Sequence, residues 1–325
     1  MWLYFEPFIC IRNILTMNTL EARHISKSYA QHKALDDVSI AVKQGTVFGL
    51  LGPNGAGKTS LIRIINQITG PDSGEVLFNG QKLEPLHREF IGYLPEERGL
   101  YKKMKVGEQC MYLAQLKGLS KADAKKRLMD WFVKFEIHHW WDKKIEDLSK
   151  GMAQKVQFIT TVLHDPKLLI LDEPFSGFDP INAELIRQEM LRLKNEGCTI
   201  ILSTHDMGSV EELCDEIALI NRSRVILDGT VKEVKNRFRT RVYEVKYQGM
   251  AMDLGISLWA AFELVKNEAQ EDHAVAHIRI PEGSNLNQLL NALIPNIDII
   301  SVREMVPDMN QIFIEAVNKF NSEQA

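Results

Sequence analysis

The sequence Gly52-Pro53-Asn54-Gly55-Ala56-Gly57-Lys58-Thr59 fits the pattern GxxxxGK[ST] and decides how the chain around it folds. The apolar run Val47–Leu51 precedes it and the amphipathic stretch Leu61–Ile68 follows, which predicts a strand, a loop and a helix. Glycines let successive backbone N–H groups surround an anion at the helix N-terminus without Cβ clashes. We expect Lys58 to carry positive charge to the β- and γ-phosphates of a nucleotide, and the Thr59 hydroxyl to ligate Mg²⁺.

A second apolar run, Leu168–Leu171, ends in the two carboxylates Asp172 and Glu173. Parallel strands buried on both faces are continuously apolar, and ligands gather at their carboxyl ends. We therefore expect Asp172 to hold Mg²⁺, usually through water, and Glu173 to orient and polarise an attacking water. A strand followed by Asp-Glu is weak evidence alone, but together with Lys58 it indicates nucleotide hydrolysis.

Short β-branched runs alternate with longer helical stretches from Thr19 to about Ile226, which is typical of α/β folds. The runs that predict strands are Val38–Val42, Thr46–Leu51, Val76–Phe78, Ile91–Leu94, Leu168–Leu171, Thr199–Ser203 and Ile217–Asn221. A long helical interval separates the strands at Ile91 and Leu168, so we expect a helical subdomain at about residues 97–150.

The basic run Lys235–Arg241 marks a domain boundary, with one domain expected over residues 17–238 and a small α+β domain over 239–325. The run itself is either a solvated linker face or a contact with acidic lipid headgroups. In the second domain, strands are predicted around Tyr243–Tyr247, His277–Ile280 and Ile297–Val302, and helices around Leu286–Leu293 and Ile312–Val317.

The composition, with 45% hydrophobic and 25% charged residues, excludes disordered and collagen-like classes. A net charge of −4 gives no general attraction to nucleic acid. The four cysteines lie far apart without a CxxC pair, which fits reduced thiols in a cytosol. No stretch reaches the roughly 18 apolar residues that span a bilayer.

The apolar N-terminal segment MWLYFEPFICIRNIL reads poorly as a signal peptide, because it lacks a basic n-region and a small-residue cleavage site. Met17 begins a plausible native start. We expect residues 1–16 to be a leader that is not native or is disordered, and a membrane-touching segment is the alternative. Further along, the cluster His138-His139-Trp140-Trp141 has no carboxylate or cysteine at ligand spacing, so we expect packing rather than a metal site.

These motifs resemble those of the ABC ATPases, and the similarity covers about residues 19–240. Leu148-Ser149-Lys150-Gly151-Met152 occupies the place of the family signature LSGGQ. Ser149 and Gly151 match the signature, whereas Lys150 and Met152 depart from it. The resemblance implies that this loop closes over ATP bound to the partner subunit, through the Ser149 hydroxyl and backbone N–H groups. Ser149 also fits a simple helix cap.

Other positions receive roles only from the resemblance. Ser176-Gly177-Phe178-Asp179 is similar to the D-loop of the family, with Phe178 in place of leucine. His205 matches the switch histidine, which implies contact with the γ-phosphate and a catalytic role beside Glu173 and Lys58. The nucleotide-binding set then comprises Tyr29, Gly52, Pro53, Asn54, Gly55, Ala56, Gly57, Lys58, Thr59 and Ser60. Tyr29 matches the aromatic that stacks on adenine, and simple packing is the alternative.

Glu96 stands where the family has the Q-loop glutamine. A carboxylate can still ligate Mg²⁺, so the implied metal ligands are Thr59, Asp172 and Glu96. The same carboxylate adds negative charge near the phosphates.

The resemblance implies an ATP-hydrolysing subunit of an ABC transporter with ATP and Mg²⁺ as cofactors. PEERGLY and LSKGM resemble bacterial exporters with short C-terminal domains, a subgroup that includes sodium-extruding subunits. The implied partners are a second copy or a paired ABC subunit, joined head to tail, and a separate transmembrane permease, with no nucleic acid. The expected location is peripheral, at the cytoplasmic face of the cell membrane. The alternative is a single-cassette ABC ATPase in the cytosol that serves assembly or maintenance; a non-hydrolysing regulator is disfavoured because Asp172 and Glu173 are both present.

Overall fold

The computed structural model describes residues 17–324 except 97–98 and 259–260, so the leader expected over residues 1–16 lies outside the described residues. The chain forms two compact units that meet between Gly229 and Thr230. This boundary lies earlier in the chain than the one expected at 238–239, because helix α7 (Val231–Arg237) belongs to the second unit. In the described part of the chain, no helix is both long and apolar enough to cross a bilayer.

A six-stranded sheet forms the centre of the first unit, with the strand order β10-β9-β3-β8-β7-β6. Its strands are Val47–Leu51 (β3), Ile91–Leu94 (β6), Leu168–Asp172 (β7), Thr199–Ser203 (β8), Glu216–Asn221 (β9) and Arg224–Thr230 (β10). Strands β6, β7, β8, β3 and β9 pair in parallel. Every residue of β3, β7, β8 and β9 is buried, and the central residues of these strands are therefore apolar.

A second, antiparallel sheet covers the helix that follows the phosphate loop. Its order is β2-β1-β4-β5, and its strands are Asn18–Tyr29 (β1), His32–Lys43 (β2), Ser73–Phe78 (β4) and Gln81–Lys82 (β5). Leu20 and Val38 from this sheet share one buried cluster with Leu61 of helix α1 (Lys58–Ile65) and Ile170 of β7. The cluster therefore fixes α1, and with it the phosphate loop, between the two sheets.

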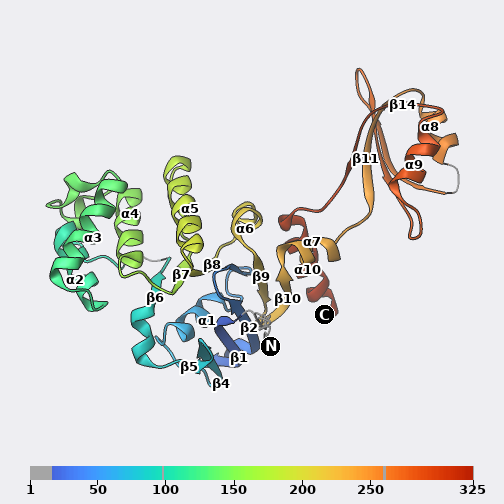
Figure 1. Ribbon diagram of the computed structural model, residues 1–325. Coiled ribbons are helices and arrows are strands. Elements are labelled where there is room, and N and C mark those ends of the chain that lie inside the picture. Colours follow the sequence, from blue (N-terminus) through green and yellow to red (C-terminus); the bar gives the residue numbers. More distant parts are fainter. Residues whose placement is uncertain (1–16, 97–98, 259–260, 325) are drawn as a thin grey trace, which may run out of the picture. The chain divides into compact units, whose positions relative to one another are not determined.

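Helices α2 (Val106–Leu116), α3 (Lys121–Lys134) and α4 (Lys150–Val162) lie side by side and form the helical part of the first unit (Figure 1). Helices α5 (Pro180–Asn195) and α6 (Met207–Leu213) follow β7 and β8. Short 3₁₀ turns occupy Pro85–Phe90, His138–Trp140 and Ile145–Asp147. Trp140 is buried, and Trp141 packs edge-on to Phe132 at 5.7 Å, so the aromatic pair fills the helical core.

The second unit is an antiparallel sheet with two helices on one face. Its order is β12-β13-β11-β14, and its strands are Val242–Gln248 (β11), Glu263–Ala269 (β12), Ala274–Arg279 (β13) and Asp298–Glu304 (β14). Val245 and Ile278 from the sheet form a buried cluster with Leu254 of α8 (Ala251–Leu258) and Leu289 of α9 (Leu286–Leu293). Helices α7 and α10 (Met309–Glu323) begin and end this unit, which is an α+β domain.

Candidate active site

Two glycines let the phosphate loop pass between neighbouring strands. Gly57 caps α1 with a φ of 117°, and a Cβ there would overlap the carbonyl of Ala34. Gly52 has a φ of 149°, and a Cβ there would overlap the carbonyl of Ile220. Lys58 begins the helix, and its Nζ donates hydrogen bonds to the carbonyls of Gly52 at 2.6 Å and Pro53 at 3.1 Å. Only glycine fits either position without moving the backbone.

The residues at the end of the phosphate loop differ in how far they are exposed to solvent. Lys58 is buried, Ser60 is half-buried, and Thr59 is exposed in the first turn of α1. Ala56 is buried, whereas Asn54 and Gly55 are exposed. The exposed tip with a buried ammonium beneath it suits a loop that receives an anion from outside.

Three carboxylates gather around Lys58. Burial lowers the pKa of Lys58, and Glu173, Asp172 and Glu96 act in the opposite direction. Burial also raises the pKa of Asp172, which Glu96 and Glu173 raise further. These mutual effects place Glu96 beside the phosphate loop and the end of β7. The repulsion among the carboxylates would be relieved by a divalent cation.

The donor set fits Mg²⁺, provided that nucleotide phosphates complete it. Among the residues the structure describes, no three His, Cys, Asp or Glu side chains form a group that could hold a metal ion alone. Mg²⁺ commonly takes only one or two carboxylates from a protein, together with water and phosphate oxygens. Asp172 and the Thr59 hydroxyl, with Glu96 nearby, provide ligands of that kind.

Glu173 sits in a strained backbone conformation that its neighbours hold in place. Its φ is 49°, in the left-handed region, and its N–H donates to the carbonyl of Ser203 at 2.8 Å. Its side chain is 14% exposed, with Oε1 2.7 Å from Nδ1 of His205. The Thr204 hydroxyl donates to Oε2 at 3.3 Å. The ends of β7 and β8 therefore bring together Glu173 and His205, which are far apart in sequence.

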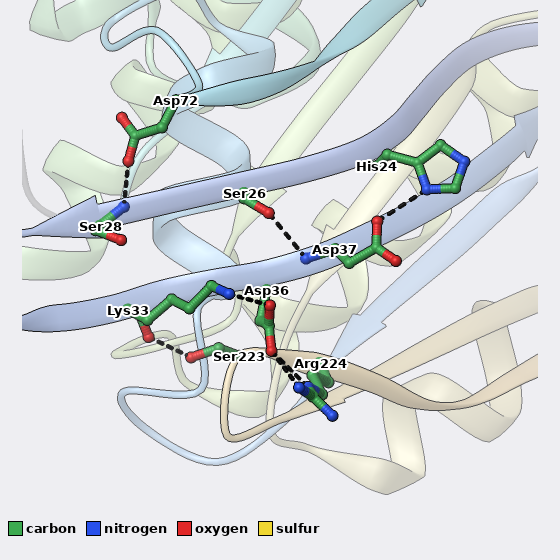
Figure 2. Close-up of polar contacts among 9 residues, drawn as sticks. All are labelled: His24, Ser26, Ser28, Lys33, Asp36, Asp37, Asp72, Ser223 and Arg224. Carbon is green, nitrogen blue, oxygen red and sulfur yellow. Dashed lines mark hydrogen bonds and ion pairs between the residues drawn. The ribbon is translucent and has the colours of Figure 1, made fainter.

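Tyr29 is the last residue of β1 and lies on an exposed hairpin that Asp72 anchors through the two preceding residues. The tyrosine is 41% exposed, with Lys27 Nζ 5.6 Å from its ring centroid. Asp72 accepts hydrogen bonds from Lys27 Nζ and from the N–H of Ser28, both at 2.7 Å; the second is drawn in Figure 2. These contacts lower the pKa of Asp72, Lys27 being the largest cause. The tyrosine ring is thus held at an accessible position where a planar base could stack.

Ser223, which has no motif around it, links the hairpin to the phosphate loop. It lies in the turn between β9 and β10 with a φ of 72°. Its N–H donates to the carbonyl of Ala56 at 3.1 Å, and its carbonyl accepts from the N–H of Asp36 at 2.8 Å. Its hydroxyl donates to the carbonyl of Lys33 at 2.5 Å (Figure 2). Sequence reasoning missed this residue, because two of its three bonds are made by backbone atoms.

Charged side chains reinforce the same junction. Asp36 pairs with Lys33 and, at 2.5 Å, with Arg224, the residue that follows Ser223 (Figure 2). These cations lower the pKa of Asp36, Lys33 being the largest cause.

The segment Leu148–Met152 lies at the N-terminus of α4, against Ser176–Asp179 of the same chain. The Ser149 hydroxyl caps the helix by accepting from the N–H of Met152 at 3.3 Å. Gln154 Nε2 donates to the carbonyl of Ser176, and the ring of Phe178 lies beside Gly151. Asp179 caps α5 by accepting from two backbone N–H groups at 3.1 Å.

A cavity of about 220 Å³ opens between these two segments and the end of β7. Its lining includes Glu96, Lys150, Asp172, Glu173 and Phe178. Ser149 and Tyr29 are not part of that lining. The structure thus brings the carboxylates and Lys58 together, while the hydroxyl of Ser149 caps α4 outside the cavity lining of its own chain.

Two family models match the chain, one in each unit. The family described as ABC transporter matches residues 35–176. The family described as ATP-binding protein DrrA1-3-like, C-terminal domain, matches residues 229–317.

Comparison with individual proteins indicates the same family. The chain is 46% identical over 215 residues to the Bacillus subtilis ABC transporter ATP-binding protein YhaQ, covering 66% of this chain and 72% of that protein. It is 31% identical over 234 residues to the Escherichia coli lipopolysaccharide export system ATP-binding protein LptB, covering 70% and 97%. A solved structure of an ATP-binding subunit of an ABC transporter superposes with a TM-score of 0.64 at 32% identity, covering 68% and 93%. The chain therefore belongs to the ATP-binding subunits of ABC transporters, ATPases that bind ATP and hydrolyse it.

Proposed function

We propose that this ATPase powers a separate membrane permease that exports its substrate. The relative LptB is named for lipopolysaccharide export, which supports the direction. No helix in the described part of the chain could cross a bilayer, so the transport path would belong to another protein.

In the proposed site, Gly52–Ser60 surround the phosphates and Tyr29 stacks on adenine. Lys58 leaves the carbonyls of its own loop to contact the β- and γ-phosphates. Thr59, Asp172 and Glu96 would hold Mg²⁺, which when bound neutralises charge on the phosphates.

Glu173 is placed to accept the proton of the attacking water. Its carboxylate projects from the end of β7, next to Asp172, and is oriented by His205 and Thr204. A general base has to lie within hydrogen-bonding distance of the water it activates, and its orientation is therefore part of its function. His205 acts by holding Glu173 and, in the closed site, by contacting the γ-phosphate.

The signature segment would serve ATP on a second cassette, either another copy or a paired ABC subunit. Ser149 is exposed at the N-terminus of a 13-residue helix, where backbone N–H groups favour an anion. Its absence from the cavity lining of its own chain supports a role in trans, and the D-loop Ser176–Asp179 lies against the same segment.

A groove of about 540 Å³ carries the permease proposal. It lies where the turn Pro85–Phe90 and β6 meet α2 and α4, and Leu86, Tyr93, Leu116 and Lys117 contribute to its lining. Leu86 and Leu116 are 59% and 64% exposed, so both offer apolar surface to a partner at this groove. An amphipathic segment of the permease could bury both leucines and place an acidic group against the basic side chains of the groove.

We propose that the neighbouring segment Glu96–Tyr101 contacts the permease as well; its residues 97–98 lie outside the described residues. The groove joins the nucleotide site to that segment through β6, because Glu96 follows its last residue by two positions. Movement at the nucleotide site could therefore reach a partner seated in the groove.

The test is a pull-down with a matched pair of variants. The tagged chain is recovered from membranes of its native host in mild detergent, and co-purifying proteins are identified by mass spectrometry. We expect a polytopic protein with about six hydrophobic segments at equal stoichiometry. Leu116→Asp should lose it, whereas Val133→Asp, an equally exposed position on α3, should retain it. Recovery of only a cytosolic partner would replace the transporter proposal with an assembly or maintenance ATPase.

A further inference from the structure

We infer that Lys150, although it lies in the signature segment, is also a positioning residue for the nucleotide bound to its own chain. Its ammonium offsets the carboxylates of that site. The inference rests on the proposed nucleotide site and adds to it a contribution in cis from a segment expected to act in trans.

The geometry places the Lys150 side chain on the nucleotide side of the D-loop. Lys150 is the first residue of α4 and helps to line the cavity that contains Glu96, Asp172 and Glu173. Its side chain lies across Gly177, where an added methyl group would overlap the end of the lysine. Gly177 has a φ of 84°, so the D-loop turns in a way that leaves this face open for the lysine.

The cavity is lined by more acidic than basic side chains, and this imbalance is the reason for the role inferred for Lys150. The described lining contains three carboxylates, Glu96, Asp172 and Glu173, and Lys150 is its one basic member. The three carboxylates line one small cavity, and like charges at such short range repel one another. Nucleotide phosphates entering beside them meet the same repulsion.

Lys150 reduces this repulsion through its charge. Its side chain helps to line the cavity, so a positive charge lies beside the three carboxylates. The lysine is exposed, so its contribution is screened by solvent and modest in size. The stem of the lysine also packs against Gly177 of the D-loop of the same chain.

The experiment measures ADP binding to dilute full-length protein, under conditions where sedimentation shows single chains, so that no partner subunit contributes. Lys150→Gln should weaken ADP binding about threefold and Lys150→Glu about tenfold, with Lys150→Arg close to wild type. The loss should shrink as salt is raised, because screening acts on charge and not on packing. Lys155→Gln on the same helix, away from the cavity lining, is the matched control and should bind normally.

A second substitution checks the proposed cause. If Lys150 offsets Glu96, the double variant Glu96→Gln with Lys150→Gln should recover most of the affinity lost by Lys150→Gln alone. Unchanged ADP binding by both Lys150→Gln and Lys150→Glu would overturn the inference and leave Lys150 to the partner site. Failure of the wild-type chain to bind ADP would instead overturn the nucleotide site itself, and this inference with it.

Discussion

His205 Nδ1 lies 2.7 Å from Glu173 Oε1, and this contact joins the ends of two adjacent parallel strands. Glu173 has a left-handed backbone, which for a residue other than glycine costs roughly 1–3 kcal/mol. The N–H bond to the Ser203 carbonyl and the side-chain bonds to His205 and Thr204 offset that cost. The strain therefore keeps the carboxylate in one orientation at the point where water would be activated.

The first prediction concerns the base itself. Glu173→Gln keeps the size of the side chain and one acceptor oxygen but cannot accept a proton, so ATP hydrolysis should fall about 100-fold or more while ATP binding persists. Steady-state release of phosphate and a separate binding titration measure the two effects. Glu184→Gln, at an exposed position on α5, is the control and should hydrolyse ATP normally. Hydrolysis by Glu173→Gln at the wild-type rate would show that another residue is the base.

The second prediction separates the base of the nucleotide from its phosphates. Tyr29→Ala removes a half-exposed ring from the hairpin, and ATP should bind about tenfold more weakly, as expected for the loss of one stacked base. Inorganic triphosphate, which has no base, should bind the variant and the wild type equally. Tyr112→Ala, an exposed tyrosine on α2, is the control. Equal ATP affinity for Tyr29→Ala and wild type would leave Tyr29 with packing alone.

The structure reproduces most closely those predicted strands that a short stretch of sequence specifies by itself. Ile91–Leu94 and Thr199–Ser203 have the predicted bounds, because both are short apolar runs that pair in parallel and bury most of their side chains. Strand β1 was not predicted, because its alternation is interrupted by register shifts near His24, whose φ is 53°. Strand β12, ELVKNEA, was also missed, since most of it is exposed at the edge of its sheet and carries little apolar signal.

The residues of the site also differ in whether a local sequence pattern could predict their roles. Lys58, Asp172 and Glu173 could be predicted because the chemistry of phosphate and metal binding restricts the residue types at fixed spacing. The contact between His205 and Glu173 depends on which strands are neighbours, which no local pattern specifies. The role of Ser223 is still harder to predict, because its backbone N–H and carbonyl would make the same hydrogen bonds if another residue type stood at this position.

The third prediction tests the Ser223 turn. Ser223→Val places a β-branched residue at a φ of 72° and removes the hydroxyl bond to Lys33, which together should cost about 2–4 kcal/mol of unfolding free energy. Ser223→Gly also loses the hydroxyl but relieves the backbone, so its loss should stay near 1 kcal/mol or below. Thermal unfolding of both variants gives the comparison. Equal stability of the two would mean that the left-handed backbone at this turn is not a constraint.

The last prediction follows from a histidine beneath the proposed permease groove. Burial lowers the pKa of His164 to about 4, and Lys117 contributes to the shift. The folded chain therefore keeps His164 neutral, whereas the unfolded chain protonates it below its ordinary pKa near 6.5. Between these values the unfolded state binds more protons, so stability is complete above about pH 6.5 and is lost as the pH falls toward 4.

The size of that loss can be measured by substitution. His164 should account for on the order of 3 kcal/mol of unfolding free energy across the whole interval, and for about 2 kcal/mol between pH 7 and pH 5. Urea unfolding at several pH values should show a shallower pH dependence for His164→Asn than for wild type. His139→Asn, an exposed histidine in the helical part, should keep the wild-type dependence. If His164→Asn keeps it too, the pKa of His164 is the same in the folded and the unfolded chain, and burial does not lower it.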